Sequence, residues 1–465
     1  MKFRTEKDSM GEINVPEEAY YGAQTQRAID NFPISGIPFD RAFIQALGYV
    51  KQAAAQSNKA LDLLSIEVAD LISKAAQEVI DGKLDGHFPI DIFQTGSGTS
   101  TNMNANEVIA NRASELAKET GAGDLVIHPN DHVNFGQSSN DVIPTALRVA
   151  AVLSITRELI PALQHLQETF GKKGDEYKQV ARTGRTHLMD AMPITIKQQF
   201  GGYERQLLLG VERLESSLKR LRELPQGGTA VGTGINTHEK FGQKFAEILS
   251  SLTSESFTEA ANHFEAQATV DAPVEMSGQI KTIAVSLLKI VNDLRWMNSG
   301  PNSGLSDVKL AALQPGSSIM PGKVNPVAEE SAAMVCARII GNDAGITIAG
   351  QAGNFELNVM LPLVAANLNE SIRLLAKSAV NLADRSVSRL TVNVEQMEDK
   401  LGKNPILVTA LNPVIGYDLA AKIAKTAYAE DRSLKDVALE MTDLTERELD
   451  AALDPLKMTR GGFTE

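Results

Sequence analysis

The sequence predicts an all-α fold, and three observations point to it. Between residues 142 and 384, apolar side chains recur at the spacing of helices over several long segments. Runs that alternate apolar and polar residues, as half-buried strands do, are scarce throughout the chain. The chain has 465 residues, of which 43% are hydrophobic. A chain of this length predicts roughly two to four folded units with ample apolar content for their cores.

The centre of the chain is expected to form a bundle of long helices. Three apolar stripes step by three and four residues, the spacing of a coiled-coil-like helix face, and they run through residues 207–221, 283–297 and 364–382. Helices of about 25 to 30 residues are each roughly 40 Å long, so they need long neighbours to cover their faces. Additional apolar positions beside the stripes predict burial on a second side by other subunits.

The two flanks of this bundle have different patterns. The N-terminal part mixes short helical segments with loops rich in glycine and asparagine, and it is predicted to be a separate domain. Near the C-terminus, DRSLKDVALEM and TERELDAALDP are typical of short helices that carry their own N-cap residues. These patterns predict three domains, at residues 1–138, 139–390 and 391–465.

Charge and cysteine content exclude several classes of function. The net charge of −13 disfavours nucleic acids and anionic membranes as partners. A single cysteine, Cys336, can form neither an intrachain disulfide nor an iron-sulfur cluster, and its apolar neighbours predict simple burial. The chain starts without the apolar segment of a signal peptide, and no run approaches the roughly 18 apolar residues of a membrane span. We therefore expect a cytoplasmic protein.

The most informative motif is GSSIMPGKVNP at residues 316–326, which predicts a loop that binds an anion and then opens a helix. Its glycines let backbone N–H groups approach a ligand, Lys323 adds positive charge, and Pro326 suits the first helical position. A nucleotide P-loop is excluded, because such a loop needs four residues between its glycines and Ser or Thr after the lysine. Here five residues separate Gly316 from Gly322, and Val324 follows the lysine.

Three further polar stretches share this design, and each is expected where a helix begins. They are TGSGTSTN at residues 95–102, QSSND at residues 137–141 and GRTH at residues 184–187. Singly, such a stretch is most often an ordinary N-cap or turn. Several helix N-termini aimed at one point would bind a small dianion, because their N–H groups are unpaired and carry partial positive charge.

The signature loop resembles the family of class II fumarases, aspartate ammonia-lyases and argininosuccinate lyases, whose shared motif is GSSxMPxKxNP. The resemblance covers nearly the whole chain, from VPEEAYYGAQTQRA at residues 15–28 to NPVIGYDLAAKIA at residues 412–424. His187 and the Asn-Thr-His run at residues 236–238 are more similar to class II fumarases, whereas PVAEE after the signature loop is less typical of them. The resemblance implies a homotetramer with a central core of long helices, whose sites combine residues from three subunits.

For chemistry, the resemblance implies reversible hydration of fumarate to (S)-malate in the tricarboxylic acid cycle, by anti addition and elimination through an aci-carboxylate, without cofactor or metal. It implies that Ser317 acts as the base and that His187 serves the leaving hydroxyl. Glu330 is expected to hold that histidine, with Glu329 as the adjacent alternative. The positions that match the family's substrate-binding residues are Ser97, Thr99, Ser138, Ser139, Asn140, Thr186, Ser318, Lys323 and Asn325.

Two motifs have weaker interpretations. HPND resembles a second, non-catalytic dicarboxylate site of fumarases at His128, Asn130 and Asp131, but Leu125 stands where the family often has arginine, and an ordinary turn explains the motif equally well. A GxGxxT run begins at Gly232, but no strand is predicted before it, so a dinucleotide site is disfavoured and close helix packing or substrate contact is expected. The alternatives for the whole chain are an aspartate ammonia-lyase and a non-catalytic structural protein on this fold.

Overall fold

The computed structural model describes residues 2–119, 121 and 125–462, which fold into helices joined by small two-stranded sheets. This confirms the predicted all-α fold class. The chain forms two compact units. Unit 1 comprises Met1–Pro161, Gly210–Ala284 and Cys336–Ala376, and unit 2 comprises Ala162–Leu209, Val285–Val335 and Lys377–Glu465. The three domains that the sequence suggests, at residues 1–138, 139–390 and 391–465, stay predictions.

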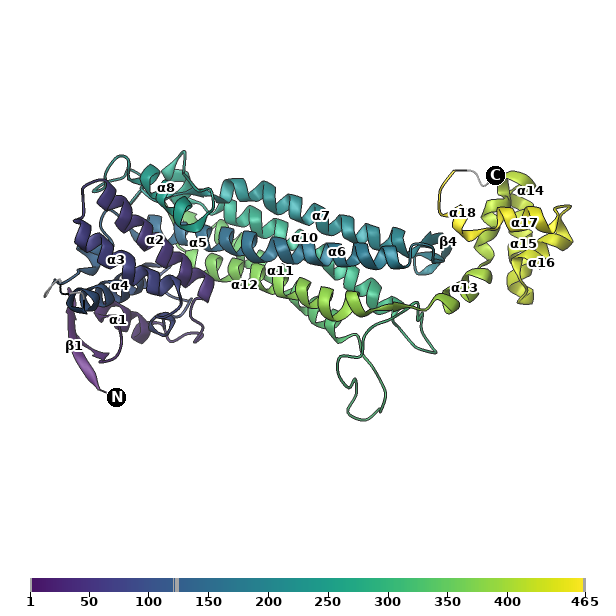
Figure 1. Ribbon diagram of the computed structural model, residues 1–465, viewed down its shortest axis with the longest axis horizontal. Helices are drawn as coiled ribbons and strands as arrows, with labels where there is room; N and C mark the ends of the chain where they lie inside the picture. The colour runs from purple at the N-terminus through teal and green to yellow at the C-terminus, as the bar shows by residue number, and fades with distance from the viewer. Residues whose placement is uncertain (1, 120, 122–124, 463–465) are drawn as a thin grey trace. The chain divides into compact units, whose positions relative to one another are not determined.

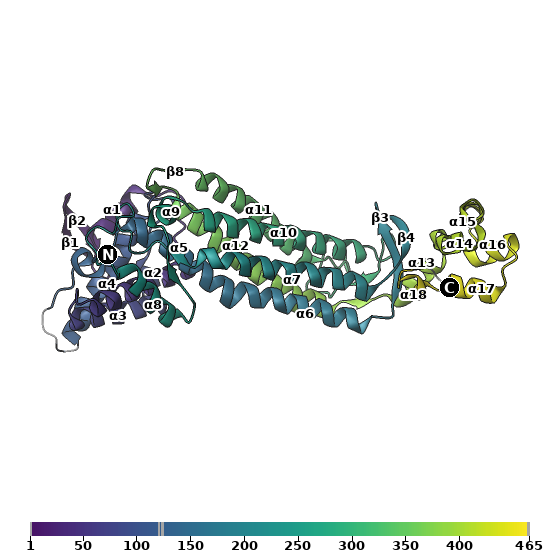
Figure 2. The same cartoon turned by 90° about the horizontal axis from the view of Figure 1, so that it is seen from above.

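Four long helices contribute one part to each unit: α7 (Ile196–Leu221), α10 (Asp271–Met297), α11 (Val327–Gly350) and α12 (Leu361–Asn381). Within each unit their segments run alongside one another in both views (Figures 1 and 2). The predicted apolar stripes are buried throughout, which confirms the long-helix core: Leu207, Val211, Leu214, Leu218 and Leu221; Ile283, Leu287, Ile290, Leu294 and Met297; Val364, Leu368, Ile372, Leu375, Ala379 and Leu382.

In unit 1, α2 (Arg41–Ala60) packs closely against α3 (Ile66–Ile80) because its buried face consists largely of small residues. A Cβ on Gly48 would lie 2.8 Å from Ile80 Cγ1, so only glycine allows this approach. The other elements of unit 1 are β1 (Phe3–Asp8), β2 (Gly11–Pro16), α1 (Ala23–Asn31), η1 (Asp85–His87), α4 (Thr99–Glu119), η2 (Pro129–Val133), α5 (Ser139–Ser154), η3 (Ile155–Leu159), β5 (Glu223–Leu224), α8 (Phe241–Thr253), β6 (Thr258–Glu259), α9 (His263–Ala268), β8 (Gly353–Asn354) and β9 (Leu357–Asn358).

Unit 2 contains α6 (Ile160–Glu176), of which all but the first two residues belong to it, and an antiparallel hairpin of β3 (Ala181–Thr186) and β4 (Met189–Thr195). The expectation that GRTH opens a helix was therefore wrong. The pairing of β3 with β4 contains a bulge between Thr183 and Arg185, where a Cβ on Gly184 would lie 2.4 Å from Met192 O, so this position suits glycine. The hairpin then reverses at His187 and Leu188.

The last part of unit 2 is a cluster of short helices around Leu411, Ile423, Val437 and Leu449, all fully buried. Ser433 caps α16 (Leu434–Met441), and Thr445 forms a capping box with α17 (Glu446–Ala452), which confirms both predicted helices. The remaining elements are β7 (Val308–Lys309), η4 (Leu382–Ser386), η5 (Val387–Arg389), β10 (Thr391–Val392), α13 (Val394–Gly402), η6 (Pro405–Leu411), α14 (Asn412–Ile415), α15 (Tyr417–Glu430) and α18 (Pro455–Met458).

Helix α11 carries the single cysteine and is the most apolar of the long helices. Cys336 is buried as predicted, and burial raises the pKa of its thiol to about 12. Among the described residues, α11 is also the one helix whose length and composition would suffice to cross a membrane, a test that the sequence was not expected to meet. This is weak evidence for a span, because core helices pass the same test. The helix moreover begins with Glu329 and Glu330 in its first turn.

Candidate active site

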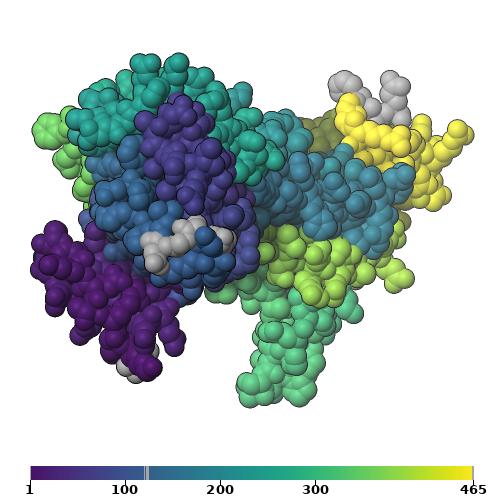
Figure 3. Space-filling view, turned by 60° about the vertical axis from the view of Figure 1, so that its left-hand side comes forward, coloured from purple at the N-terminus to yellow at the C-terminus, as the bar shows by residue number. Residues whose placement is uncertain are grey.

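The signature loop closes on itself just before α11. The Gly316 N–H donates to Lys323 O at 2.9 Å, and Asn325 Nδ2 donates to Gly316 O at 2.6 Å. The helix then begins at Val327, directly after Pro326 and one residue later than the sequence predicts. The segment that contains the loop projects from the surface of its unit, and it is drawn in green in Figure 3. An exposed loop with a closed base can present its backbone N–H groups to a ligand.

Ser317 is the side chain on which the loop's backbone N–H groups converge. Its Oγ accepts from the N–H of Ile319 at 3.2 Å and from that of Met320 at 3.0 Å. Two donors on one hydroxyl oxygen favour the build-up of negative charge on that oxygen. The arrangement supports the predicted alkoxide, whereas Ser318 beside it is exposed.

Gly316 provides a direct test of the loop geometry. A Cβ at this position would lie 2.3 Å from Lys323 O, so Gly316→Ala must push apart the two ends of the loop. If Ser317 is the base that the resemblance implies, kcat/KM should fall by about 10²-fold, since a shift of about 1 Å in a catalytic group costs that much. The melting temperature should change little because the loop is exposed. Gly402→Ala is the matched control, since no atom lies within 4 Å of its added Cβ, and steady-state assays of both variants make the comparison. Equal activity of the two would contradict the proposed loop geometry.

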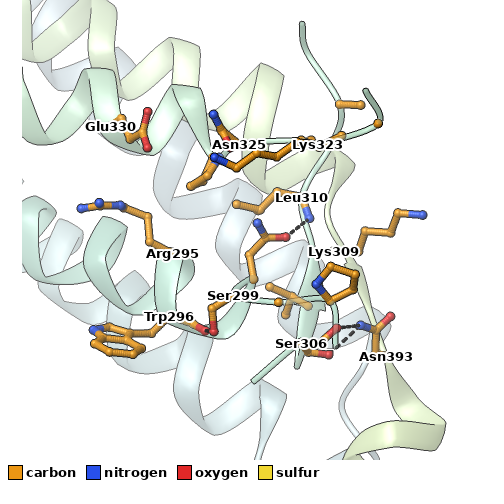
Figure 4. Close-up of a pocket in the computed structure, with 18 of the residues that line it drawn as sticks. Arg295, Trp296, Ser299, Ser306, Lys309, Leu310, Lys323, Asn325, Glu330 and Asn393 are labelled. Carbon is orange, nitrogen blue, oxygen red and sulfur yellow. Dashed lines mark hydrogen bonds between the residues drawn. The ribbon is translucent and has the colours of Figure 1, made fainter. Parts of the chain in front are cut away.

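A cavity of about 940 Å³ in unit 2 brings together three predicted site residues, Lys323, Asn325 and Glu330. In Figure 4 these three lie along one wall of the cavity. Arg295 and Trp296 from α10 and Lys309 from β7 also line it, and the sequence analysis did not identify them. Three cationic side chains around one cavity suit a dianionic ligand.

The two adjacent glutamates of α11 have different environments. Glu329 is 1% exposed and accepts a hydrogen bond from Ser386, and burial raises the pKa of its carboxyl. Glu330 is half-buried and lines the cavity. Consecutive helix residues point about 100° apart, which explains the difference. Of the two carboxylates, Glu330 is the one placed to reach a ligand.

Thr186 and His187 lie at the tip of the β3–β4 hairpin and are exposed. His187 and Leu188 form the two-residue turn, with φ of 55° and 61°, the positive values that this kind of hairpin turn requires. The base of the tip is anchored by Arg185, whose Nη1 donates to Asp307 Oδ2 at 2.6 Å and whose Nη2 donates to Oδ1 at 3.2 Å. This bidentate pair fixes the base of the hairpin that carries His187 at its tip.

Unit 1 brings the TGSGTSTN and QSSND stretches together at the N-termini of α4 and α5, as predicted for each stretch. Ser97 Oγ and Thr99 Oγ1 are 2.8 Å apart at the start of α4. Ser138 caps α5, and the Ser139 hydroxyl accepts from Asn102 Nδ2 at 3.0 Å. The two helix starts therefore present hydroxyls and N–H groups side by side, which favours an anionic ligand.

The glycine-rich loop at residues 227–238 packs against this pair of helix starts. Asn140 Nδ2 donates to Ala230 O at 2.8 Å, and a Cβ on Gly136 would lie 2.7 Å from Thr237 Oγ1. A Cβ on Gly228 would lie 1.8 Å from Gln267 Oε1 on α9, so these glycines serve close packing, as expected. The two-residue strand β5 does precede the run, but a turn follows it instead of the helix that a dinucleotide site requires.

The HPND motif folds into a short helical turn, η2. His128 Nδ1 accepts from the Asp131 N–H at 3.1 Å, and the same nitrogen lies 3.2 Å from Asp131 Oδ2. His128, Asn130 and Asp131 are all exposed. A carboxylate beside the imidazole would repel a dicarboxylate, while the exposed imidazole would attract one when protonated. The second dicarboxylate site stays a prediction.

The predicted residues thus form separate groups. Unit 1 joins Ser97, Thr99, Ser138, Ser139 and Asn140, and unit 2 joins Lys323, Asn325 and Glu330 around its cavity. Thr186, His187, Ser317 and Ser318 are not among the residues that line that cavity. Within the described ranges, no group of three or more His, Cys, Asp or Glu side chains is placed to hold a metal ion. Sequence reasoning also missed Arg185, although it lies inside GRTH, and its partner Asp307 could not be inferred from so distant a segment.

Family models match most of the chain. A lyase model matches residues 11–341, and a model of the fumarase C C-terminus matches residues 407–460. The chain is 53% identical over 462 residues to a fumarate hydratase class II of Xylella fastidiosa, covering 99% of this chain and 96% of the relative. It is 52% identical over 460 residues to fumarate hydratase class II 2 of Pseudomonas aeruginosa, covering 99% of both chains.

Solved structures have the same fold. A class II fumarase from Schistosoma mansoni is similar with a TM-score of 0.95 and 40% identity, covering 98% of this chain and 99% of that one. A fumarate lyase:delta crystallin from Brucella melitensis, described as bound to cobalt, is similar with a TM-score of 0.93 and 43% identity, covering 98% and 100%. The chain therefore belongs to the fumarase/aspartase family, among its class II fumarases.

Proposed function

We infer that the chain is a hydro-lyase that interconverts fumarate and (S)-malate by anti addition and elimination of water, as in the tricarboxylic acid cycle. The observation that carries this inference is the signature loop of a family member, which gives Ser317 Oγ two backbone N–H donors. Relatives of this chain at more than 50% identity are named fumarate hydratase class II. The residue roles below are proposals.

In the direction of elimination, Ser317 as its alkoxide removes a proton from C3 of malate and becomes the neutral hydroxyl. The C–H electron pair then enters the adjacent carboxylate, which becomes a doubly charged aci-carboxylate. A serine hydroxyl is a weak base, so its alkoxide needs stabilisation, and the N–H groups of Ile319 and Met320 supply it. The proton passes to Ser317 Oγ, and no further oxidant or reductant is needed.

Lys323 and Asn325 stabilise the charge on that carboxylate. One contributes an ammonium group and the other an amide, and both line the cavity. The starts of α4 and α5, with Thr99, Ser138 and Asn140, hold the second carboxylate through hydroxyls and helix N-termini. Donors fixed before the reaction stabilise the developing charge without reorganisation, which makes them the largest catalytic contribution.

His187 serves the hydroxyl that leaves from C2. An imidazole can deliver a proton near neutral pH, directly or through one water, so that the group departs as water. Glu330 holds and charges this histidine in the assembled enzyme, and its half-buried position on the cavity wall leaves its carboxylate available. The aci-carboxylate then returns its electrons to form the double bond of fumarate.

We propose a homotetramer in which each site combines residues from three subunits. The apolar helix α11 supports this assembly, because Met334 is 69% exposed and Ile348 is 59% exposed on it. Apolar faces of this kind are usually covered by other subunits. Sedimentation of the purified protein should give the mass of four chains. We place the enzyme in the cytoplasm.

One assay tests the reaction. The purified protein is incubated without nucleotide or added metal, separately with malate and with aspartate, and the absorbance of fumarate is followed. Turnover of malate alone supports the proposal. Turnover of aspartate alone would identify an aspartate ammonia-lyase, and turnover of neither by an intact tetramer would favour a non-catalytic structural protein.

A further inference from the structure

Asp141 is a fully buried carboxylate that joins two segments of the candidate substrate site. It lies in the first turn of α5 and is 0% exposed. Its Oδ1 accepts from the Ser138 N–H at 2.9 Å. Its Oδ2 accepts from the N–H of Gly227 at 3.1 Å and from that of Thr229 at 3.0 Å. One side chain therefore binds the start of α5 to the glycine-rich loop 86 residues away in the sequence.

Lys51 on α2 supports the same segment from the other side and is also 0% exposed. Its Nζ donates to Asn134 Oδ1 and to Gln137 Oε1, each at 3.0 Å. Asn134 and Gln137 lie just before Ser138, and Asn134 Nδ2 also donates to Gln137 O at 3.1 Å, so the ammonium holds the side chains that support the turn leading into α5. Burial raises the pKa of Asp141, and the positive charge of Lys51 partly opposes that rise.

The geometry links this buried pair to the residues that face the ligand. Ser138, Ser139 and Asn140 stand between Gln137 and Asp141, so both ends of this triplet are held by the pair. Asn140 Nδ2 also donates to Ala230 O at 2.8 Å, in the loop that Asp141 binds. If the carboxylate released Gly227 and Thr229, the loop and Asn140 would lose their common support. Neither Asp141 nor Lys51 is exposed, so neither can bind the ligand itself.

We propose that Asp141 and Lys51 are positioning residues, which hold Ser138, Ser139 and Asn140 and the loop at residues 227–238 in the arrangement that binds a carboxylate of the substrate. This inference rests on the proposed function, because it assigns the triplet to substrate binding. It predicts that loosening the pair weakens substrate binding more than it slows the chemical step.

Burial opposes the ionisation of both Asp141 and Lys51. Burial raises the pKa of Asp141 from 3.8 to about 6 and lowers the pKa of Lys51 from 10.5 to about 7. The raised pKa of Asp141 therefore stabilises the folded state below pH 3.8, and this contribution is lost as the pH rises through about 6. The lowered pKa of Lys51 stabilises the folded state above pH 10.5, and this contribution is lost as the pH falls through about 7. Both groups are charged together between about pH 6 and 7, where folding gains least from them.

Other charged groups lie on the elements packed around Asp141, and each has its own partners. Arg148 on α5 donates to Arg220 O and Glu223 O. His263 on α9 contacts Pro225 O through Nδ1 and Glu259 Oε1 through Nε2. Glu107 on α4 accepts from the start of α1. Lys51 is the side chain whose charge acts on Asp141 most directly.

The test compares Asp141→Asn with wild type in steady-state assays on malate. An amide can accept at one oxygen only, so it cannot serve both Ser138 and the loop. We expect KM to rise at least about tenfold, with kcat within about threefold, since ground-state and transition-state binding are lost together. In wild type, KM should rise as the pH falls below about 6, where Asp141 takes up a proton. In Asp141→Asn this rise should vanish, and in Lys51→Met it should begin at higher pH.

Glu448→Gln is the matched control, because Glu448 is the capping-box carboxylate of α17 in the other unit. It should leave KM and its pH dependence unchanged. Hydrogen exchange gives a readout that needs no turnover: the amides of Gly227 and Thr229 should lose protection below about pH 6 in wild type. Unchanged KM in a folded Asp141→Asn variant, or in Lys51→Met if the first variant does not fold, would overturn the inference. Lost protection with unchanged KM would overturn it while leaving the proposed function intact. A wild-type tetramer inactive on malate and fumarate would overturn both.

Discussion

Ser317→Ala is expected to lower kcat for malate by about 10³-fold, within the range that general bases contribute. The substitution removes the oxygen that accepts the C3 proton and leaves the N–H groups of Ile319 and Met320 without their acceptor. Those groups belong to an exposed loop and can bond to water, so the melting temperature and the tetramer should be preserved. Steady-state assays, with thermal unfolding and sedimentation, make the measurement.

Ser318→Ala is the comparison variant that distinguishes the role of Ser317 from that of the adjacent serine. Ser318 is the adjacent, exposed serine of the same loop, and we propose that it contacts the substrate without removing its proton. Its loss should raise KM severalfold and leave kcat within a few-fold of wild type. Near-normal kcat in Ser317→Ala, or equal loss of kcat in the two variants, would show that the base is another group.

The long helices could be predicted because periodicity reports which face of a helix is buried. Leu207, Leu287 and Leu368 each belong to a stripe whose members are all buried. The starts of α4 and α5 were predictable for a similar reason, since short polar side chains cap helices through local bonds. Ser138 and Asp141 form such a capping box within four residues of sequence. Local chemistry of this kind is visible in the sequence.

The GRTH hairpin could not be predicted, because its cause is not local. The four residues GRTH contain several hydrogen-bond donors and resemble a helix N-cap. In the structure, however, Arg185 forms an ion pair with Asp307, which lies 122 residues away in the sequence. The same limit applies to Asp141, whose capping role is local but whose bonds to Gly227 and Thr229 cross 86 and 88 residues. Sequence reasoning named the residues proposed to carry the chemistry, but partners as distant as Asp307 and the loop at residues 227–238 could not be inferred from local patterns.

His187→Asn is the second variant with a large expected effect, a fall in kcat of about 10²-fold or more. Asparagine tolerates positive φ well, so it should keep the turn in which His187 has φ of 55°. The substitution therefore removes the imidazole and leaves the hairpin in place. Leu188→Asn is the matched control, since Leu188 has φ of 61° in the same turn and contributes no proton. If both variants lost activity equally in the malate assay, the shape of the turn would explain the loss and the imidazole would have no role with the leaving hydroxyl. If only His187→Asn loses activity, the proton that turns the hydroxyl into water comes through this side chain.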